Sequence, residues 1–239
     1  MSCDPQNAGV LACVRLPNSP FDVTLTPGDV AAVTIPDTRK IVFFQTHSDQ
    51  LEQIRPLGTS QKEFNLSGRG HGIHFNNGRL FVVIEQEDNK SCYIAELNLT
   101  DGTELKRFSE ELPPRSRYIT TLKEKVYITH PDGVIRLKDT DSRHRRSFRS
   151  RLVEEQPVKH VRTLRHVHGV VEVDGDILVC SESNAGVYRL LNVGSMFRGA
   201  VLAVNQPRAV CFCPDSRRLF VSHPRSIGNK ANFFTVGRV

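Results

Sequence analysis

Two histidines that each precede a glycine are the first candidates for chemistry. His71 and His168 occur in the similar segments Gly-His-Gly-Ile and Val-His-Gly-Val, with His74 and His166 close by in the sequence. Imidazoles that converge on one point could bind a metal ion or an anionic group. The alternative is that each His-Gly pair begins a strand and bonds the carbonyls of a loop, because a metal site needs several ligands at matched distances. We favour the structural role and expect no metal and no cofactor.

Arginines gather in one segment of the chain. Residues 142–151 read Ser-Arg-His-Arg-Arg-Ser-Phe-Arg-Ser-Arg, and further basic residues follow as far as residue 166. Arginine forks suit phosphate oxygens, and an aromatic ring can stack on a base. The segment predicts a surface for a polyanion or a partner; the alternatives are a solvated loop, or a kinase site at Ser147. The candidate binding residues are Arg143, Arg145, Arg146, Phe148, Arg149, Arg151, Arg162 and Arg165.

Short apolar hairpins recur along the chain and must position these residues. Five copies pair two apolar runs around a turn, and four of the turns contain Pro-Gly-Asp, Asn-Asn-Gly, Asp-Gly-Asp or Pro-Asp-Ser. These residues favour tight hairpin turns. The clearest copy covers residues 168–180. Copies return every ~40–50 residues, which is the period of propeller blades.

The repeats predict an all-β fold, a β-propeller of four-stranded antiparallel blades, because each copy has room for two further strands. In such a fold, His71 and His168 would begin innermost strands at one mouth of the central channel. The blades are expected at residues 20–66, 70–112, 115–155, 166–205 and 206–239.

The last copy stops after three strands. Residues 9–16 read as an apolar strand at the other end of the chain. If this strand completed the last blade, it would close a five-bladed ring in a single domain and bury two sheet edges. The alternative is an incomplete ring of six blades.

Two of the copies resemble NHL repeats. They read Gly-Val-Val-Glu-Val-Asp-Gly-Asp-Ile-Leu-Val-Cys from residue 169, and Pro-Arg-Ala-Val from residue 207 with Arg-Leu-Phe-Val-Ser from residue 218. The resemblance implies a propeller like the C-terminal part of tripartite-motif (TRIM) ubiquitin ligases, which binds protein partners or RNA. The chain departs from the pattern where Ser181, Thr129 or Ser222 replaces the acidic residue usual after the second strand. It also lacks a cysteine- and histidine-rich zinc domain, so we expect no ligase chemistry in it.

Carboxylates at residues 85–88 give one hint of catalysis. Glu85, Glu87 and Asp88 could hold Ca²⁺ or act as acid and base, as in lactonase-type propellers. We expect a solvated turn instead, because only Glu182 occupies a corresponding position in another copy.

The composition is typical of a globular protein. Hydrophobic residues make up 38% of the 239 residues, and the net charge of +6 is compatible with an acidic partner. The six cysteines follow no disulfide or zinc spacing. The first residues lack the basic region and apolar core expected of a signal peptide, and no apolar run approaches the ~20 residues that span a bilayer. We therefore expect a cytoplasmic, monomeric domain that does not bind a membrane.

The function expected from the sequence is a non-catalytic scaffold that holds a protein partner, as a substrate-recognition module in ubiquitin ligation would. One alternative is an RNA-binding propeller that uses residues 143–165. A second alternative is a metal-dependent hydrolase of the lactonase type.

Overall fold

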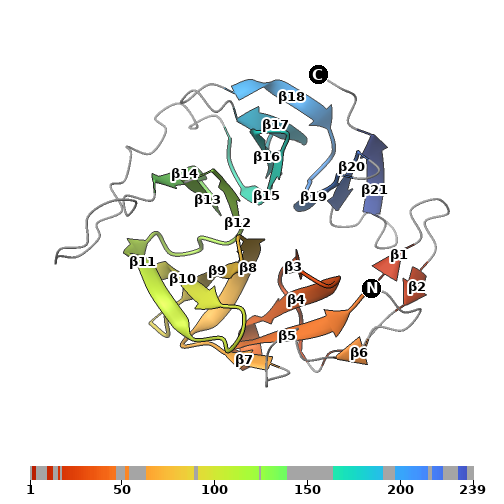
Figure 1. Cartoon of the computed structure of the whole chain (residues 1–239). Helices are drawn as coiled ribbons and strands as arrows, with labels where there is room; N and C mark the ends of the chain where they lie inside the picture. Colours follow the sequence, from red (N-terminus) through yellow and green to blue (C-terminus); the bar gives the residue numbers. More distant parts are fainter. Residues whose placement is uncertain are drawn as a thin grey trace. The chain divides into compact units, whose positions relative to one another are not determined.

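The computed structural model of the chain describes residues 2–3, 10–12, 16, 18–46, 52–53, 63–88, 91–123, 125–138, 164–190, 197–214, 217–222 and 231–235. These residues form two compact units, Met1–Pro114 and Arg115–Val239. In both units the strands of each sheet run side by side and antiparallel (Figure 1). Helical structure in the described residues is limited to the short 3₁₀ turn η1 (Pro36–Thr38). No helix in this part of the chain is long and apolar enough to cross a membrane.

The first unit contains two large sheets. Its strands are β1 (Ser2–Cys3), β2 (Val10–Ala12), β3 (Val23–Thr26), β4 (Val30–Ile35), β5 (Lys40–Gln45), β6 (Glu52–Gln53), β7 (Glu63–Asn65), β8 (Arg69–Asn76), β9 (Arg79–Glu85), β10 (Cys92–Asn98) and β11 (Glu104–Leu112). One sheet has the order β3-β4-β5-β6, with β7 also paired to β5, and the other has the order β8-β9-β10-β11.

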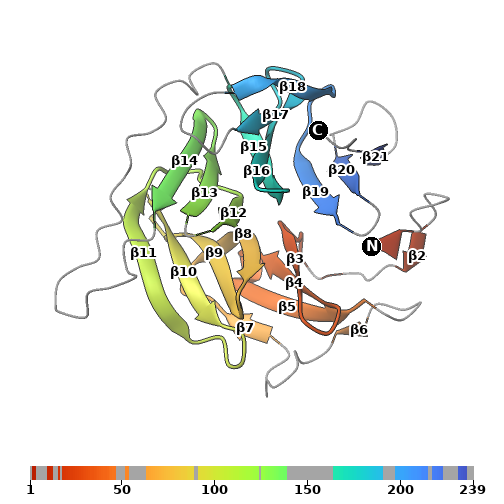
Figure 2. The ribbon, with the colours of Figure 1, turned by 45° about the horizontal axis from the view of Figure 1, so that its top comes forward.

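The second unit contains three further sheets. Its strands are β12 (Ile119–Leu122), β13 (Lys125–His130), β14 (Gly133–Lys138), β15 (Val167–Val173), β16 (Asp176–Ser181), β17 (Gly186–Leu190), β18 (Phe197–Ala203), β19 (Ala209–Cys213), β20 (Arg218–Ser222) and β21 (Ala231–Thr235). The sheets follow the chain as β12-β13-β14, β15-β16-β17-β18 and β19-β20-β21, and the 45° rotation in Figure 2 shows the same grouping.

Tight turns join the first two strands of the sheets, as the repeats predict. Asn77 and Gly78 have φ values of 48° and 78°, and Asp174 and Gly175 have φ values of 51° and 85°. Two successive residues with positive φ define the type I′ turn, which Asn-Gly and Asp-Gly favour. The turn between β3 and β4 places its positive φ values at Gly28 and Asp29.

Successive sheets of each unit pack face to face. In the first unit, Phe43 of β5 and Ile73 of β8 belong to one buried cluster that joins the two sheets. In the second unit, Leu178 of β16 and Leu219 of β20 belong to another. Because a sheet packed on both faces buries nearly every side chain, β4 and β16 are largely apolar rather than strictly alternating. Sheets of this order and packing are propeller blades, and the predicted all-β propeller class is confirmed.

The described part of the N-terminal segment forms a small sheet, in which β2 pairs with β1. The described part of the last sheet is β19-β20-β21, and its completion by residues 9–16 remains a prediction. β1 lies only a few residues before β2, so this local pairing costs little loop-closure entropy. The number of blades and the single-domain organisation remain predictions.

Two short strands share the outer edge of β5 in the first sheet. β6 pairs with Phe44 and Gln45 of β5. The rest of that edge of β5 is occupied by β7, through Lys40, Ile41 and Val42.

Candidate functional site

A histidine and a glutamate form a buried pair in the first unit. His71 lies near the start of β8, and Glu85 is the last residue of β9. The antiparallel register, in which Arg69 lies opposite Glu85, brings the two side chains together. His71 Nε2 is 3.0 Å from Glu85 Oε2, and both side chains are 8% exposed. Glu85 therefore does not belong to a solvated turn, although Glu87 beside it is exposed.

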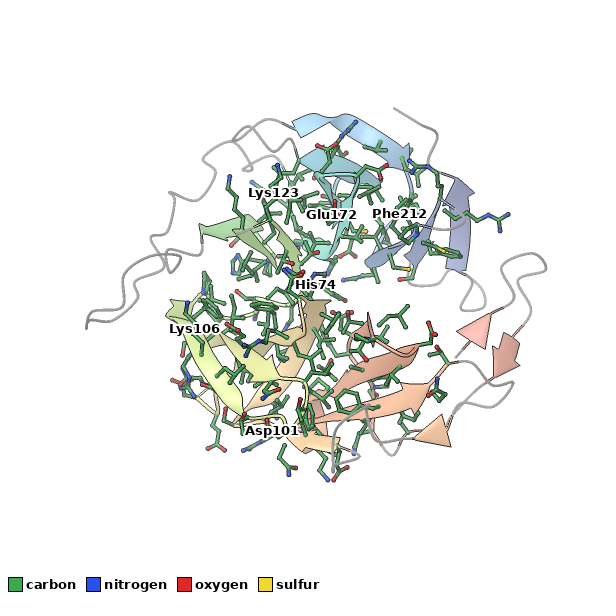
Figure 3. The ribbon with its side chains drawn as sticks, viewed as in Figure 1. His74, Asp101, Lys106, Lys123, Glu172 and Phe212 are labelled. Atoms are coloured by element: carbon green, nitrogen blue, oxygen red, sulfur yellow. The ribbon has the colours of Figure 1, made fainter. Side chains whose placement is uncertain are left out.

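The second unit contains the same pair in a more open form. His168 lies near the start of β15, and Glu182 directly follows β16. His168 Nε2 is 3.0 Å from Glu182 Oε2, and both side chains are 20% exposed. The partners are 14 residues apart in the sequence, as they are for His71 and Glu85. The equal spacing shows that the repeat itself produces the pair. Figure 3 labels His74 on β8 and Glu172 on β15, the strands on which the two histidines lie.

An arginine joins the second pair. Arg208 Nη2 donates to Glu182 Oε1 at 2.8 Å, and Arg208 Nη1 is 2.7 Å from His168 Nε2. The backbone N–H of Arg208 donates to Ser222, and its carbonyl accepts the N–H of Gly169. The arginine is thus held between the sheet that contains β15 and the sheet that contains β19. We call His168, Glu182 and Arg208 the HER cluster.

The electrostatics of the HER cluster favour a neutral imidazole beside an ionised carboxylate. Burial lowers the pKa of His168 below its ordinary value, and the positive charge of Arg208 acts in the same direction. A hydrogen bond donated by His168 lowers the pKa of Glu182 whenever Nε2 is protonated, and the positive charge of Arg208 lowers it further. Near neutral pH, the charges of Glu182 and Arg208 therefore balance.

The buried pair of the first unit belongs to a polar network that links its two sheets. The His71 ring meets Phe21 edge-on, and the His71 carbonyl accepts a hydrogen bond of 2.6 Å from Thr34 Oγ1. Asp22, next to Phe21, accepts the backbone N–H of Ile73 at 3.0 Å. Burial raises the pKa of Asp22 to about 7. These contacts hold β3, β4 and β8 together.

The structure describes one of the eight residues of the predicted basic surface. Arg143, Arg145, Arg146, Phe148, Arg149, Arg151 and Arg162 lie outside the described residues. Arg165 is described and exposed, and its backbone carbonyl accepts a hydrogen bond from Ser181 Oγ. It lies in the segment before β15, three residues from His168.

Arg208 is the residue that the sequence interpretation missed. It stands in the Pro-Arg-Ala-Val segment that resembles an NHL repeat, and Arg117 has the same backbone position in its own sheet. The N–H of Arg117 donates to Thr129, as that of Arg208 donates to Ser222. This recurrence of arginine before an inner strand was the available signal.

No metal site is formed by the described side chains: they include no group of three or more His, Cys, Asp or Glu residues that could hold an ion. His166 Nδ1 is 3.9 Å from Glu182 Oε2, so the second unit places two imidazoles and one carboxylate near each other. Such an arrangement can exchange protons and bind polar groups.

Comparisons with solved structures show the propeller fold. A functionally unknown protein from Desulfotomaculum acetoxidans matches 93% of this chain and 71% of its own, with a TM-score of 0.62 and 11% identity. A catalytically inactive histidine-to-alanine variant of virginiamycin B lyase from Staphylococcus aureus, solved with quinupristin, matches 92% of this chain and 72% of its own, with a TM-score of 0.54 and 12% identity.

A streptogramin B lyase covers 95% of this chain and 86% of its own, with a TM-score of 0.51 and 14% identity. At these identities the similarity concerns the fold alone. No protein-family model matches the chain. No characterised protein matches its sequence either.

Proposed function

We propose that the chain is a non-catalytic protein-binding propeller that holds its partner at the HER cluster. The supporting observation is the difference between two equivalent pairs. His71 and Glu85 are 8% exposed, whereas His168 and Glu182 are 20% exposed and share an arginine. The repeat accounts for the pair, but it does not account for the greater exposure of the second pair or for the contacts of Arg208 with both of its members.

The chemistry of the HER cluster suits recognition. Arg208 presents a planar fork of donors and is 40% exposed, so part of it faces solvent. Arginine is enriched among the residues that dominate the binding energy of protein interfaces. In keeping with the NHL resemblance, the scaffold would serve as a substrate-recognition module of the tripartite-motif type.

The experiment compares two arginines of the same unit. Arg208 and Arg217 are both 40% exposed. Arg217 does not belong to the HER cluster, and its Nη2 atom is 2.7 Å from Asp174 Oδ2. We expect Arg208→Ala to reduce the capture of specific partners on the tagged chain at least about tenfold, while Arg217→Ala preserves it. Quantitative mass spectrometry measures the capture, and thermal melting confirms that both variants fold. Equal capture by the two variants would contradict the proposal.

A catalytic role is the second candidate. A carboxylate beside an imidazole is an arrangement used in general acid–base catalysis. The fold is also similar to that of a lyase that is inactive when one histidine is replaced by alanine. The test is whether the chain consumes quinupristin, the compound present in that lyase structure; if it does, His168→Ala should abolish the activity. The scaffold proposal expects no consumption above the buffer rate.

RNA binding is the remaining candidate, and it rests on the basic residues 143–165. Arg165 is the one candidate residue of this surface that the structure describes, and its exposure permits contact with a phosphate. The distinguishing measurement is the dependence of RNA affinity on salt.

A further inference from the structure

One nitrogen atom of the HER cluster has two incompatible neighbours. His168 Nε2 is 2.7 Å from the donor Arg208 Nη1 and 3.0 Å from the acceptor Glu182 Oε2. An unprotonated Nε2 accepts from the arginine and has nothing to donate to the carboxylate. A protonated Nε2 donates to the carboxylate and cannot accept from the arginine. The position of one proton therefore decides which neighbour His168 binds.

We propose that the HER cluster captures a single carboxylate group of an acidic protein partner, and that proton uptake by His168 opens the site. This inference rests on the proposed function, since it names the chemical group that the scaffold would hold. We call the state with neutral His168 the closed form. In it, the unprotonated Nε2 of His168 accepts a hydrogen bond from Arg208 Nη1. When His168 takes a proton from solvent, it donates to Glu182, and the Nη1 donors turn to an incoming carboxylate.

Charge and geometry both favour a carboxylate. Arg208 Nη2 already bonds one carboxylate oxygen, Glu182 Oε1, and the planar guanidinium directs its Nη1 donors toward a second carboxylate. With His168 neutral, the charges of Arg208 and Glu182 cancel, and protonation of His168 leaves one positive charge. A single positive charge suits a singly charged carboxylate better than a phosphate, which approaches two negative charges at neutral pH.

The groups that act on His168 belong to the surrounding segments of the second unit. They are Glu182 after β16, Arg208 before β19 and His166 before β15. Strands β12 and β13 also contact β15, but none of their described charged groups acts on His168. Burial keeps the pKa of His168 below 6.5, so the ring is mainly neutral at neutral pH and the site is closed.

The first measurement is the binding of formate, a small planar carboxylate, to the intact chain at constant ionic strength. The amide signal of Gly169 reports on binding, because its N–H donates to the Arg208 carbonyl. Since binding requires one proton, we expect formate affinity to rise about tenfold between about pH 7.5 and about pH 6.5. Equal affinity at both values overturns the proposal. Phosphate that binds more tightly than formate at both values overturns the assignment to a carboxylate.

Variants identify the groups involved. His168→Gln should remove the pH dependence, while His166→Gln should keep it; the reverse result overturns the role of His168. Arg208→Ala should abolish formate binding. Arg208→Lys, which keeps the charge but lacks the fork, should weaken it, and full affinity in this variant overturns the geometry.

A long-range nitrogen–proton spectrum supplies an independent test. At neutral pH the His168 proton should lie on Nδ1, and a proton on Nε2 overturns the closed form. The outcome is separate from that of the proposed function. Formate can bind as expected even if partner capture does not depend on Arg208, in which case only the proposed function fails.

Discussion

Two half-buried titratable groups of the first unit oppose each other in their effect on stability. Burial lowers the pKa of His74 from 6.5 to about 4 and raises the pKa of Asp22 from 3.8 to about 7. The stabilisation linked to neutral His74 is complete above pH 6.5 and is lost as the pH falls through 4. The stabilisation linked to protonated Asp22 is complete below pH 3.8 and is lost as the pH rises through 7.

Single substitutions at these residues should therefore change the pH dependence of the free energy of unfolding in opposite directions. His74→Gln removes the His74 contribution, so relative to the unaltered chain its free energy of unfolding should fall by about 3 kcal/mol as the pH rises from about 4 to about 7. With Asp22→Asn, the free energy of unfolding should rise by a similar amount over the same interval. Urea unfolding at a series of pH values measures both profiles. Two variants with parallel profiles would contradict this assignment.

At the scale of elements, the close approach of β15 and β19 depends on Gly169. A Cβ atom built on Gly169 would lie 2.8 Å from both Ala209 Cα and Val210 N, and these are backbone atoms that cannot rotate away. The same approach brings Arg208 to His168. A glycine at this position is therefore needed for both the packing of the sheets and the HER cluster.

Gly169→Ala should force the two sheets apart and lower the free energy of unfolding by about 1–3 kcal/mol. It should also reduce partner capture, because Arg208 moves with β19. The matched control is Gly175→Asn in the β15–β16 turn. Nothing lies within 4 Å of a Cβ there, and asparagine tolerates positive φ. Denaturant unfolding compares the two variants, and equal stability would show that the contact at Gly169 is not tight.

At the scale of the whole molecule, the net charge of +6 is compatible with RNA binding, and the salt dependence of RNA affinity tests this. If the basic segment binds RNA, affinity should fall steeply as salt rises, because each phosphate contact releases counterions. The double change of Arg145→Glu and Arg146→Glu should weaken binding at least about tenfold at low salt and flatten this dependence. Electrophoretic mobility shifts with a single-stranded RNA at several salt concentrations measure the affinity of both proteins. Unaltered binding by the double variant would eliminate the basic segment as the contact surface.

The sequence by itself determined the repeating hairpins of this protein. Asn77-Gly78 and Asp174-Gly175 adopt the positive φ values that their residue types favour, and apolar runs on either side become buried strands. These features depend on neighbours in the chain, so local sequence contains the necessary information. The equivalence of His71 and His168 was visible for the same reason, since a repeat places equal residues at equal positions.

Only the tertiary structure decided what those histidines contact. Glu85 and Glu182 meet their histidines through strand register, and Arg208 reaches His168 from another sheet, 40 residues further along the chain. The two pairs also differ in exposure, 8% against 20%, although their sequence spacing is the same.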